Sequence, residues 1–203
     1  MRIRLDAQFE KFQHMQSAVR QIEEGLVQRR GKKGGTAYFE TSAPHRGIYA
    51  PLPVDVFIGH LERHPELKPS FSVADLGSGL GELCFAGSFH FRKMVGYEKD
   101  EELIGEADNI RQLLGFDNVS FRQEDFLRAD LSEFDALIFY QPFLEDFIPL
   151  MSWRLRVMRP GTHIISCTLH REIFDDKNFQ RIAGKGEAPE KSWRTLLETY
   201  LRI

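Results

Sequence analysis

The sequence predicts an α/β fold in which a doubly wound, mostly parallel sheet is covered by helices on both faces. From residue 70 onward, short apolar runs alternate with segments whose apolar residues recur every three or four positions. A glycine-rich turn follows the first apolar run, and acidic residues follow successive runs. Strands that alternate with amphipathic helices are typical of parallel sheets.

An N-terminal helical extension is expected before the sheet begins, with an amphipathic helix over residues 5–29. Its apolar residues recur at helical steps and therefore share one face; they are Phe9, Phe12, Met15, Val19, Ile22 and Leu26. This face is expected to pack on the main domain, with a homodimer contact or a lid over the site as alternatives. Residues 1–46 are accordingly predicted to form a helical extension and loop, and residues 47–203 the main domain.

The next elements follow from apolar periodicity and helix-end signals. Pro53 suits the first turn of a helix that ends before Pro65. The predicted strands are Phe71–Asp75, Met94–Glu98, Val119–Arg122, Ala136–Tyr140 and His163–Leu169, and the predicted helices between them are Gly81–Gly87, Glu101–Leu114 and Leu144–Met158. The last segment, Trp193–Ile203, is either a final edge strand or a helix.

Composition places the chain among ordinary globular proteins and excludes several classes of function. A formal net charge of −3 argues against general binding to nucleic acid or to a membrane surface. We expect no signal peptide and no membrane span, and Cys84 and Cys167 are interpreted as buried free thiols, which favours a cytoplasmic protein. The histidines lack metal-ligand spacing, so no metal site is expected. The basic cluster Arg29–Lys33 is interpreted as a solvated loop rather than a phosphate contact.

The most informative segment joins the first predicted strand to a helix and runs Ser72-Val73-Ala74-Asp75-Leu76-Gly77-Ser78-Gly79-Leu80-Gly81-Glu82. Ligands of open α/β sheets bind at the carboxyl ends of strands, where glycine lets the backbone approach them. A dinucleotide fingerprint would require glycine at position 82, where this chain has Glu82. Asp75 would repel a pyrophosphate but suits a ligand that carries an ammonium group.

This segment resembles the glycine loop of the class I S-adenosylmethionine-dependent methyltransferases, which have a Rossmann-like fold. The resemblance implies that S-adenosylmethionine is the cofactor and that Asp75 reaches its amino group. It implies further that the loop curves around the methionine moiety through Gly77, Ser78, Gly79 and Gly81. By position, Glu98 would bind the ribose hydroxyls, Asp125 the adenine amino group, and Phe126 a ring nitrogen through its backbone N–H.

The fourth predicted strand ends in a partial match to the family's acceptor motif. Amine and amide methyltransferases often carry Asn/Asp-Pro-Pro-aromatic here, whereas this chain has Tyr140-Gln141-Pro142-Phe143. The proline and the aromatic residue are retained, so these four residues are the candidate catalytic group. The missing Asn/Asp keeps open a non-catalytic cofactor-binding sensor or assembly subunit.

A weaker resemblance to the non-SET protein-lysine methyltransferases lies upstream, in Tyr49-Ala50-Pro51-Leu52-Pro53. It implies that Tyr49 and Pro51 lie at the mouth of the cofactor site, although a simple proline-fixed helix entry explains the same residues. The expected acceptor is a protein lysine or another amine, followed by a small molecule and then RNA. A nicotinamide oxidoreductase and an aminopropyltransferase are rival interpretations.

Overall fold

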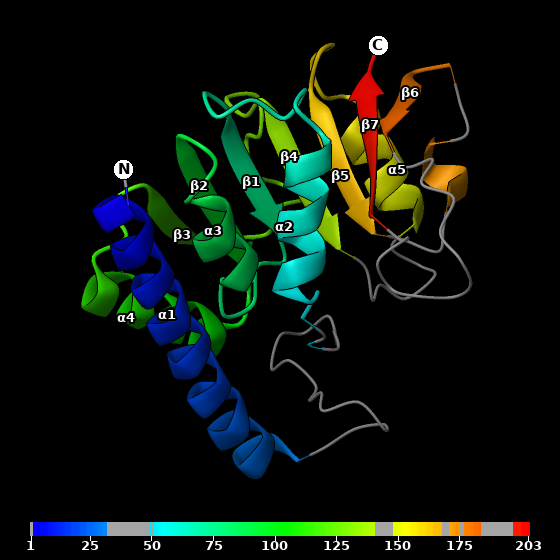
Figure 1. Ribbon diagram of the computed structural model, residues 1–203. Coiled ribbons are helices and arrows are strands. Elements are labelled where there is room, and N and C mark those ends of the chain that lie inside the picture. The colour runs from blue at the N-terminus through cyan, green and yellow to red at the C-terminus, as the bar shows by residue number, and fades with distance from the viewer. Residues whose placement is uncertain are drawn as a thin grey trace, which may run out of the picture.

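The central sheet has seven strands among the residues that the computed structural model describes, in the order β3-β2-β1-β4-β5-β7-β6 (Figure 1). The described residues are 2–31, 49, 51–140, 148–167, 171–174, 177–183 and 197–203. The strands are β1 Ser72–Leu76, β2 Lys93–Glu98, β3 Val119–Gln123, β4 Ala136–Tyr140, β5 His163–Cys167, β6 Phe179–Ala183 and β7 Leu197–Arg202. The first five are mutually parallel, and β7 runs antiparallel between β5 and β6.

Helices cover both faces of this sheet (Figure 1). They are α1 Arg2–Arg30, α2 Val54–Arg63, α3 Glu82–Gly87, α4 Glu101–Leu114, α5 Ile148–Arg156 and the 3₁₀ turn η2 Arg171–Phe174. Side chains of β1 alternate between two apolar clusters, with Val73 in the cluster of α1 to α4 and Ala74 in the cluster of α5 and η2. The predicted doubly wound α/β fold with an N-terminal helix is therefore confirmed.

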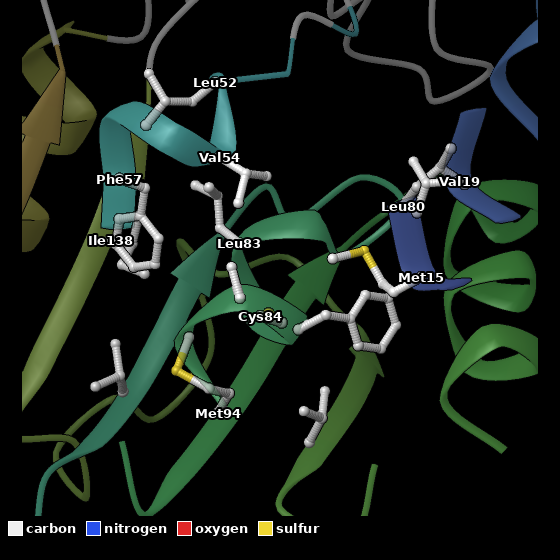
Figure 2. Packing of buried hydrophobic residues seen from close by; sticks show 14 of the residues in the cluster. Met15, Val19, Leu52, Val54, Phe57, Leu80, Leu83, Cys84, Met94 and Ile138 are labelled. Atoms are coloured by element: carbon white, nitrogen blue, oxygen red, sulfur yellow. The ribbon is translucent and has the colours of Figure 1, made fainter. Parts of the chain in front are cut away.

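The N-terminal helix α1 packs outside α3 and α4. Met15, Val19 and Leu26 are fully buried against the domain, as predicted for the apolar face, and Figure 2 shows Met15 and Val19 beside Leu80 of the glycine loop. Phe9 is the exception, because 60% of its surface is exposed. The predicted apolar face is therefore not covered by α3 and α4 at its N-terminal end, where Phe9 lies.

The basic cluster Arg29–Lys33 was predicted to be a solvated loop, and this is wrong for its first two residues. Arg29 and Arg30 belong to the last turn of α1 and form ion pairs with the first turn of α4. Arg30 donates to Asp100 Oδ2 at 2.7 Å, and Arg29 donates to Glu102 Oε1 at 2.7 Å. The rest of this cluster, residues 32–33, lies outside the described residues.

Most element boundaries agree with the sequence prediction, and the differences lie near the C-terminus. Leu197–Arg202 is a strand, which resolves the alternative left open for this segment, but it lies inside the sheet and not at its edge. The edge is formed by Phe179–Ala183, a strand that the sequence analysis did not predict. Cys84 is a buried free thiol as expected, whereas the side chain of Cys167 is outside the described residues.

Within the described residues, no helix has the length and apolarity that crossing a membrane would require.

Candidate active site

The candidate site lies at the carboxyl ends of the central strands. β1 pairs with β2 on one side and with β4 on the other, so the strand order reverses here and leaves the crevice in which such sheets bind ligands. Asp75 pairs in register with Gly96 and Ile138. Because side chains alternate along strands, Glu98 and Tyr140, two residues further on, lie on the same face of the sheet as Asp75.

The loop after β1 is fastened to β2 by its backbone. The N–H groups of Gly77 and Ser78 both donate to Tyr97 O at 2.9 Å. Gly81 has a φ of 81°, and a Cβ there would come within 2.6 Å of Phe121 Cε1, so a larger residue is excluded by both conformation and space. Gly77 is different, because nothing lies within 4 Å of the position that its Cβ would take. The loop thus packs tightly on one side and offers open backbone on the other.

Asp75 is a buried carboxylic acid with a weak partner. It is 3% exposed, and Cys84 Sγ donates to its Oδ2 at 3.6 Å. The pKa of Asp75 is raised to about 7, chiefly by burial; the hydrogen bond from Cys84 opposes this shift, and the Glu98 carboxylate makes a smaller contribution in the same direction as burial. A cation placed beside Asp75 would offset this cost, which is what the ammonium group of an amino acid ligand provides.

Glu98 connects the end of β2 to the glycine loop. Its Oε2 accepts from Gly79 N at 3.1 Å, and its Oε1 accepts from the N–H groups of Lys99 and Asp100 at 2.6 and 2.9 Å. Burial raises the pKa of Glu98, and these three backbone donors oppose the shift. Since a carboxylate offers about four lone-pair sites, acceptor capacity is left for a hydroxyl.

Asp125 lies beside the end of β2, as its predicted role requires, but it already has partners. Lys99 Nζ is 2.8 Å from Asp125 Oδ2, and Leu127 N donates to Oδ1 at 3.0 Å. Although partial burial favours the neutral acid, the ammonium group and this N–H lower the pKa of Asp125. Phe126 is 7% exposed, and its side chain packs in the cluster of α5 and η2 rather than facing the crevice. Only its backbone is therefore suited to a ligand contact.

Tyr49 covers the glycine loop. The ring lies so close to Gly79 that a Cβ there would come within 2.6 Å of Tyr49 Cε2, and the hydroxyl donates to Glu23 Oε1 of α1 at 2.8 Å. Tyr49 is 8% exposed, and Pro51 is half-buried before α2. Tyr49 of the upstream segment thus contacts the loop, and the placement of Tyr49 and Pro51 at the mouth of the cofactor site stays a prediction.

The candidate catalytic group is described only at its first residue. Tyr140 ends β4, is partly buried, and packs at the border of the cluster of α1 to α4. Gln141, Pro142 and Phe143 lie outside the described residues.

These residues fit a ligand that carries an ammonium group and hydroxyls. Ser78 Oγ is buried and has no hydrogen-bond partner among the described residues. Asp75 has a thiol as its side-chain donor, and Gly77 leaves open backbone beside both. No group of three or more potential metal-ligating side chains occurs in the described part of the chain.

A family model described as "Methyltransferase domain" matches residues 67–198, which include β1 to β5 and the glycine loop. The chain belongs to this methyltransferase family. It is therefore an enzyme domain of the class I S-adenosylmethionine-dependent superfamily, and the predicted superfamily, enzyme class and cofactor are confirmed at this level.

Solved structures show the same fold. The magnesium protoporphyrin IX methyltransferase from Synechocystis, with bound SAM, is 18% identical, with 74% of this chain and 78% of that chain covered and a TM-score of 0.58. An RNA methyltransferase from Salinibacter ruber, in complex with S-adenosyl-L-homocysteine, is 26% identical, with 75% and 92% covered and a TM-score of 0.51. No curated protein matches this methyltransferase by sequence.

Two acids that sequence motifs did not indicate approach the loop of this methyltransferase from outside the strand ends. Glu23 reaches Tyr49 from α1, and Glu82 opens α3 directly after Gly81. Burial raises the pKa of Glu82 to about 7, and the carboxylate of Glu23 adds to the shift. One signal was available for Glu23, since it directly follows Ile22 of the apolar helical face.

Proposed function

We propose that this methyltransferase transfers a methyl group from S-adenosylmethionine to an amine, foremost the side chain of a protein lysine. The main support for the cofactor site is that two acidic residues, Asp75 and Glu98, lie at the same glycine loop. Glu98 accepts from Gly79 N at 3.1 Å, and Asp75 lies buried at the start of the same loop. The sulfonium of the bound cofactor supplies an electrophilic methyl group.

Each strand end would then hold one part of the cofactor. Asp75 would bind the ammonium group, and Glu98 the two ribose hydroxyls. Gly77, Ser78, Gly79 and Gly81 would surround the methionine moiety, with the Ser78 hydroxyl as a further donor. Asp125 would accept from the adenine amino group with the lone pairs that Lys99 and Leu127 leave free. The Phe126 N–H would meet a ring nitrogen.

The acceptor would bind at the end of β4. Methyl transfer requires mainly that a lone pair be held in line with the methyl group and that water be excluded. An amine must also be unprotonated when it attacks, and the Tyr140 hydroxyl would accept or relay its proton. Tyr140 lies on the sheet face of Asp75, which supports this role. Gln141, Pro142 and Phe143 would complete the acceptor site.

Two features bear on the choice of acceptor, and a third bears on whether a methyl group is transferred at all. A net charge of −3 disfavours RNA, although one structural neighbour is described as an RNA methyltransferase. Another neighbour is described as acting on magnesium protoporphyrin IX, which keeps a small molecule second in order. The replacement of Asn/Asp by Tyr140 is the argument for the alternative, a non-catalytic cofactor-binding subunit.

The domain boundary and the homodimer remain predictions. Burial of Met15, Val19 and Leu26 within the chain's own core supports packing of α1 on the domain and uses much of the face that a dimer would need. Cytoplasmic localisation is likewise retained as a prediction.

The test combines labelled cofactor with variants of the acceptor site. The protein is incubated with methyl-labelled S-adenosylmethionine and a fractionated cell extract, and label transferred to protein, small molecules and RNA is counted. We expect label on protein, and we expect Tyr140→Phe and Gln141→Ala to lower turnover with cofactor affinity unchanged. Label in the RNA or small-molecule fraction alone would correct the acceptor. Tight cofactor binding without any transfer would establish the non-catalytic alternative.

A further inference from the structure

A residue of the N-terminal helix holds Tyr49, which lies against the glycine loop of the candidate site. Tyr49 is held between two partners that are distant in sequence: its hydroxyl donates to Glu23 Oε1 at 2.8 Å, and its ring lies on Gly79. A Cβ on Gly79 would come within 2.6 Å of Tyr49 Cε2 and 3.0 Å of Cδ2. The ring therefore lies in direct contact with the same residue, Gly79, whose N–H donates to Glu98.

Glu23 occupies an environment that is unfavourable for a carboxylate. Burial raises its pKa, and the hydrogen bond from Tyr49 and the charge of Arg20 only partly oppose the shift. Its neighbour Glu24 is exposed on the same helix. Glu23 is partly buried. Stability alone explains a carboxylate poorly at such a position, because an apolar residue of similar volume is often neutral or stabilising in place of a desolvated charge.

A second set of contacts, an ion pair at its C-terminal end, attaches helix α1 near the glycine loop. Arg30, in its last turn, donates to both carboxylate oxygens of Asp100 at 2.7 and 3.0 Å. Asp100 in turn caps α4 and donates its own N–H to Glu98 Oε1 at 2.9 Å. Both attachments of α1 thus lead to Gly79, one through Tyr49 and one through Glu98. Figure 1 shows the C-terminal end of α1 extending past the edge at which β1 and β2 end.

We propose that Glu23 is a positioning residue of the cofactor site: its carboxylate holds the Tyr49 hydroxyl, so that the Tyr49 ring closes over Gly79 and forms one wall of the site. The inference rests on the proposed function, since it assigns to α1 a part in binding S-adenosylmethionine. Its consequence is that the N-terminal helix sets cofactor affinity without touching the cofactor.

The test measures the affinity of S-adenosylhomocysteine by calorimetry and the melting temperature of the ligand-free protein. Glu23→Leu removes the acceptor, Glu23→Gln keeps an acceptor oxygen, and Tyr49→Phe removes only the hydroxyl. Glu24→Leu is the matched control, because it makes the same change at the exposed neighbouring position. The double variant Glu23→Leu/Tyr49→Phe tests whether the two groups act as one unit.

We expect Glu23→Leu and Tyr49→Phe each to weaken S-adenosylhomocysteine binding on the order of tenfold, the equivalent of one hydrogen bond to a charged group. The double variant is expected to lose no more than either single variant. Glu23→Gln should lose less than Glu23→Leu, and Glu24→Leu should bind as the parent does. The melting temperature of Glu23→Leu should change little, because removal of the partly buried charge offsets the loss of its hydrogen bond with Tyr49.

Two results would overturn the inference while the proposed function stands. One is parental affinity in Glu23→Leu. The other is a melting temperature that falls together with affinity, with additive losses in the double variant, since that combination indicates a merely structural contact. A parent protein that binds neither S-adenosylmethionine nor S-adenosylhomocysteine would contradict the proposed function itself, and the inference with it.

Discussion

At the scale of single residues, the candidate site contains carboxylates that are buried in the ligand-free protein, where no bound cation compensates their negative charge. Asp75 is the clearest case, with a pKa of about 7 that results from burial. Such a group costs stability once it ionises, and it gains a partner when a cation binds. Stability and cofactor affinity should therefore respond to pH in opposite directions.

The first prediction concerns Asp75→Asn. The folded-state pKa of about 7 lies above the unfolded value of 3.8, so the folded state binds the proton more tightly, and stability falls as pH rises between these values. We expect Asp75→Asn to melt higher than the parent at pH 8 and the difference to shrink toward pH 5. Affinity of the parent for S-adenosylhomocysteine should rise from pH 6 to pH 8, whereas that of Asp75→Asn should stay low. A parental pH profile in the variant would remove Asp75 from the ammonium site.

The second prediction concerns Glu98, which is expected to hold the ribose and also fastens Gly79. Glu98→Ala removes an ionised acceptor, and we expect cofactor binding to weaken by about 1.5–3 kcal/mol. Glu98→Gln keeps one acceptor oxygen and should lose less. Glu101→Ala, at an exposed residue in the first turn of α4, is the control for a change of charge. Calorimetry that gives the Glu98→Ala variant an unchanged dissociation constant would contradict the assignment.

At the scale of elements, the sequence predicted best where local signals and burial agree. Helix α4 was predicted from its apolar face and runs from Glu101 to Leu114, as expected. Asp100 caps its start through the N–H groups of Glu102 and Leu103, and Gly115 ends it with a φ of 64°. The strand β4 was predicted at its observed bounds because it is a continuous apolar run before a motif.

Strand β7 remained ambiguous in the sequence because two adjacent buried positions, Glu198 and Thr199, are polar. Glu198 is 5% exposed and accepts from Arg181 and Tyr200 at 3.1 and 2.6 Å. Thr199 is fully buried and lies 2.7 Å from His60 Nε2. Arg181 and His60 come from β6 and α2, so no local pattern marks the segment as a core strand.

In the candidate site, likewise, residues within a local motif were predicted, whereas contacts that depend on tertiary packing were not. Asp75 and Glu98 were predicted because each ends a strand within a recognisable motif. The pairing of Tyr49 with Glu23 joins residues 26 positions apart, and that of Arg30 with Asp100 joins residues 70 apart. Such contacts depend on how α1 packs, which apolar periodicity predicts only as a buried face.

The third prediction concerns α1 as an element. Deleting residues 1–30 removes Met15, Val19 and Leu26 from the core, and a fully buried apolar side chain of this size contributes about 1.5–3 kcal/mol. We expect the melting temperature to fall by roughly 10 °C or more and solubility to decrease. A point-substitution pair isolates the packing term: Val19→Asp should be strongly destabilising, and Phe9→Asp, at a position that is 60% exposed, should not. A truncated protein with parental melting temperature, mass in solution and activity would refute this account of α1.

At the scale of the whole molecule, several loops at the carboxyl ends of the parallel strands form the candidate site together. The loops after β1, β2 and β3 are tied together, since Gly77 and Ser78 bond to Tyr97 O, Glu124 N bonds to Glu98 O, and Lys99 pairs with Asp125. The parallel register brings these loops to one edge, and α1 is fastened to two of them. A ligand that contacts all three loops should consequently stabilise the chain as a unit.

The last prediction uses this coupling to separate the cofactor classes by thermal unfolding. A ligand that binds only the folded state adds RT ln(1 + [L]/Kd), or about 2.7 kcal/mol at a hundredfold excess over Kd. For a domain of this size that corresponds to a rise in melting temperature of roughly 5–10 °C. We expect S-adenosylhomocysteine and S-adenosylmethionine to give this rise and NAD to give none, because Asp75 at the start of the loop repels a pyrophosphate. Asp75→Asn should lose most of the rise with S-adenosylhomocysteine, while Glu24→Leu should keep it. A shift with NAD and none with either S-adenosyl compound would contradict the assignment of the site, whatever the fold of the chain.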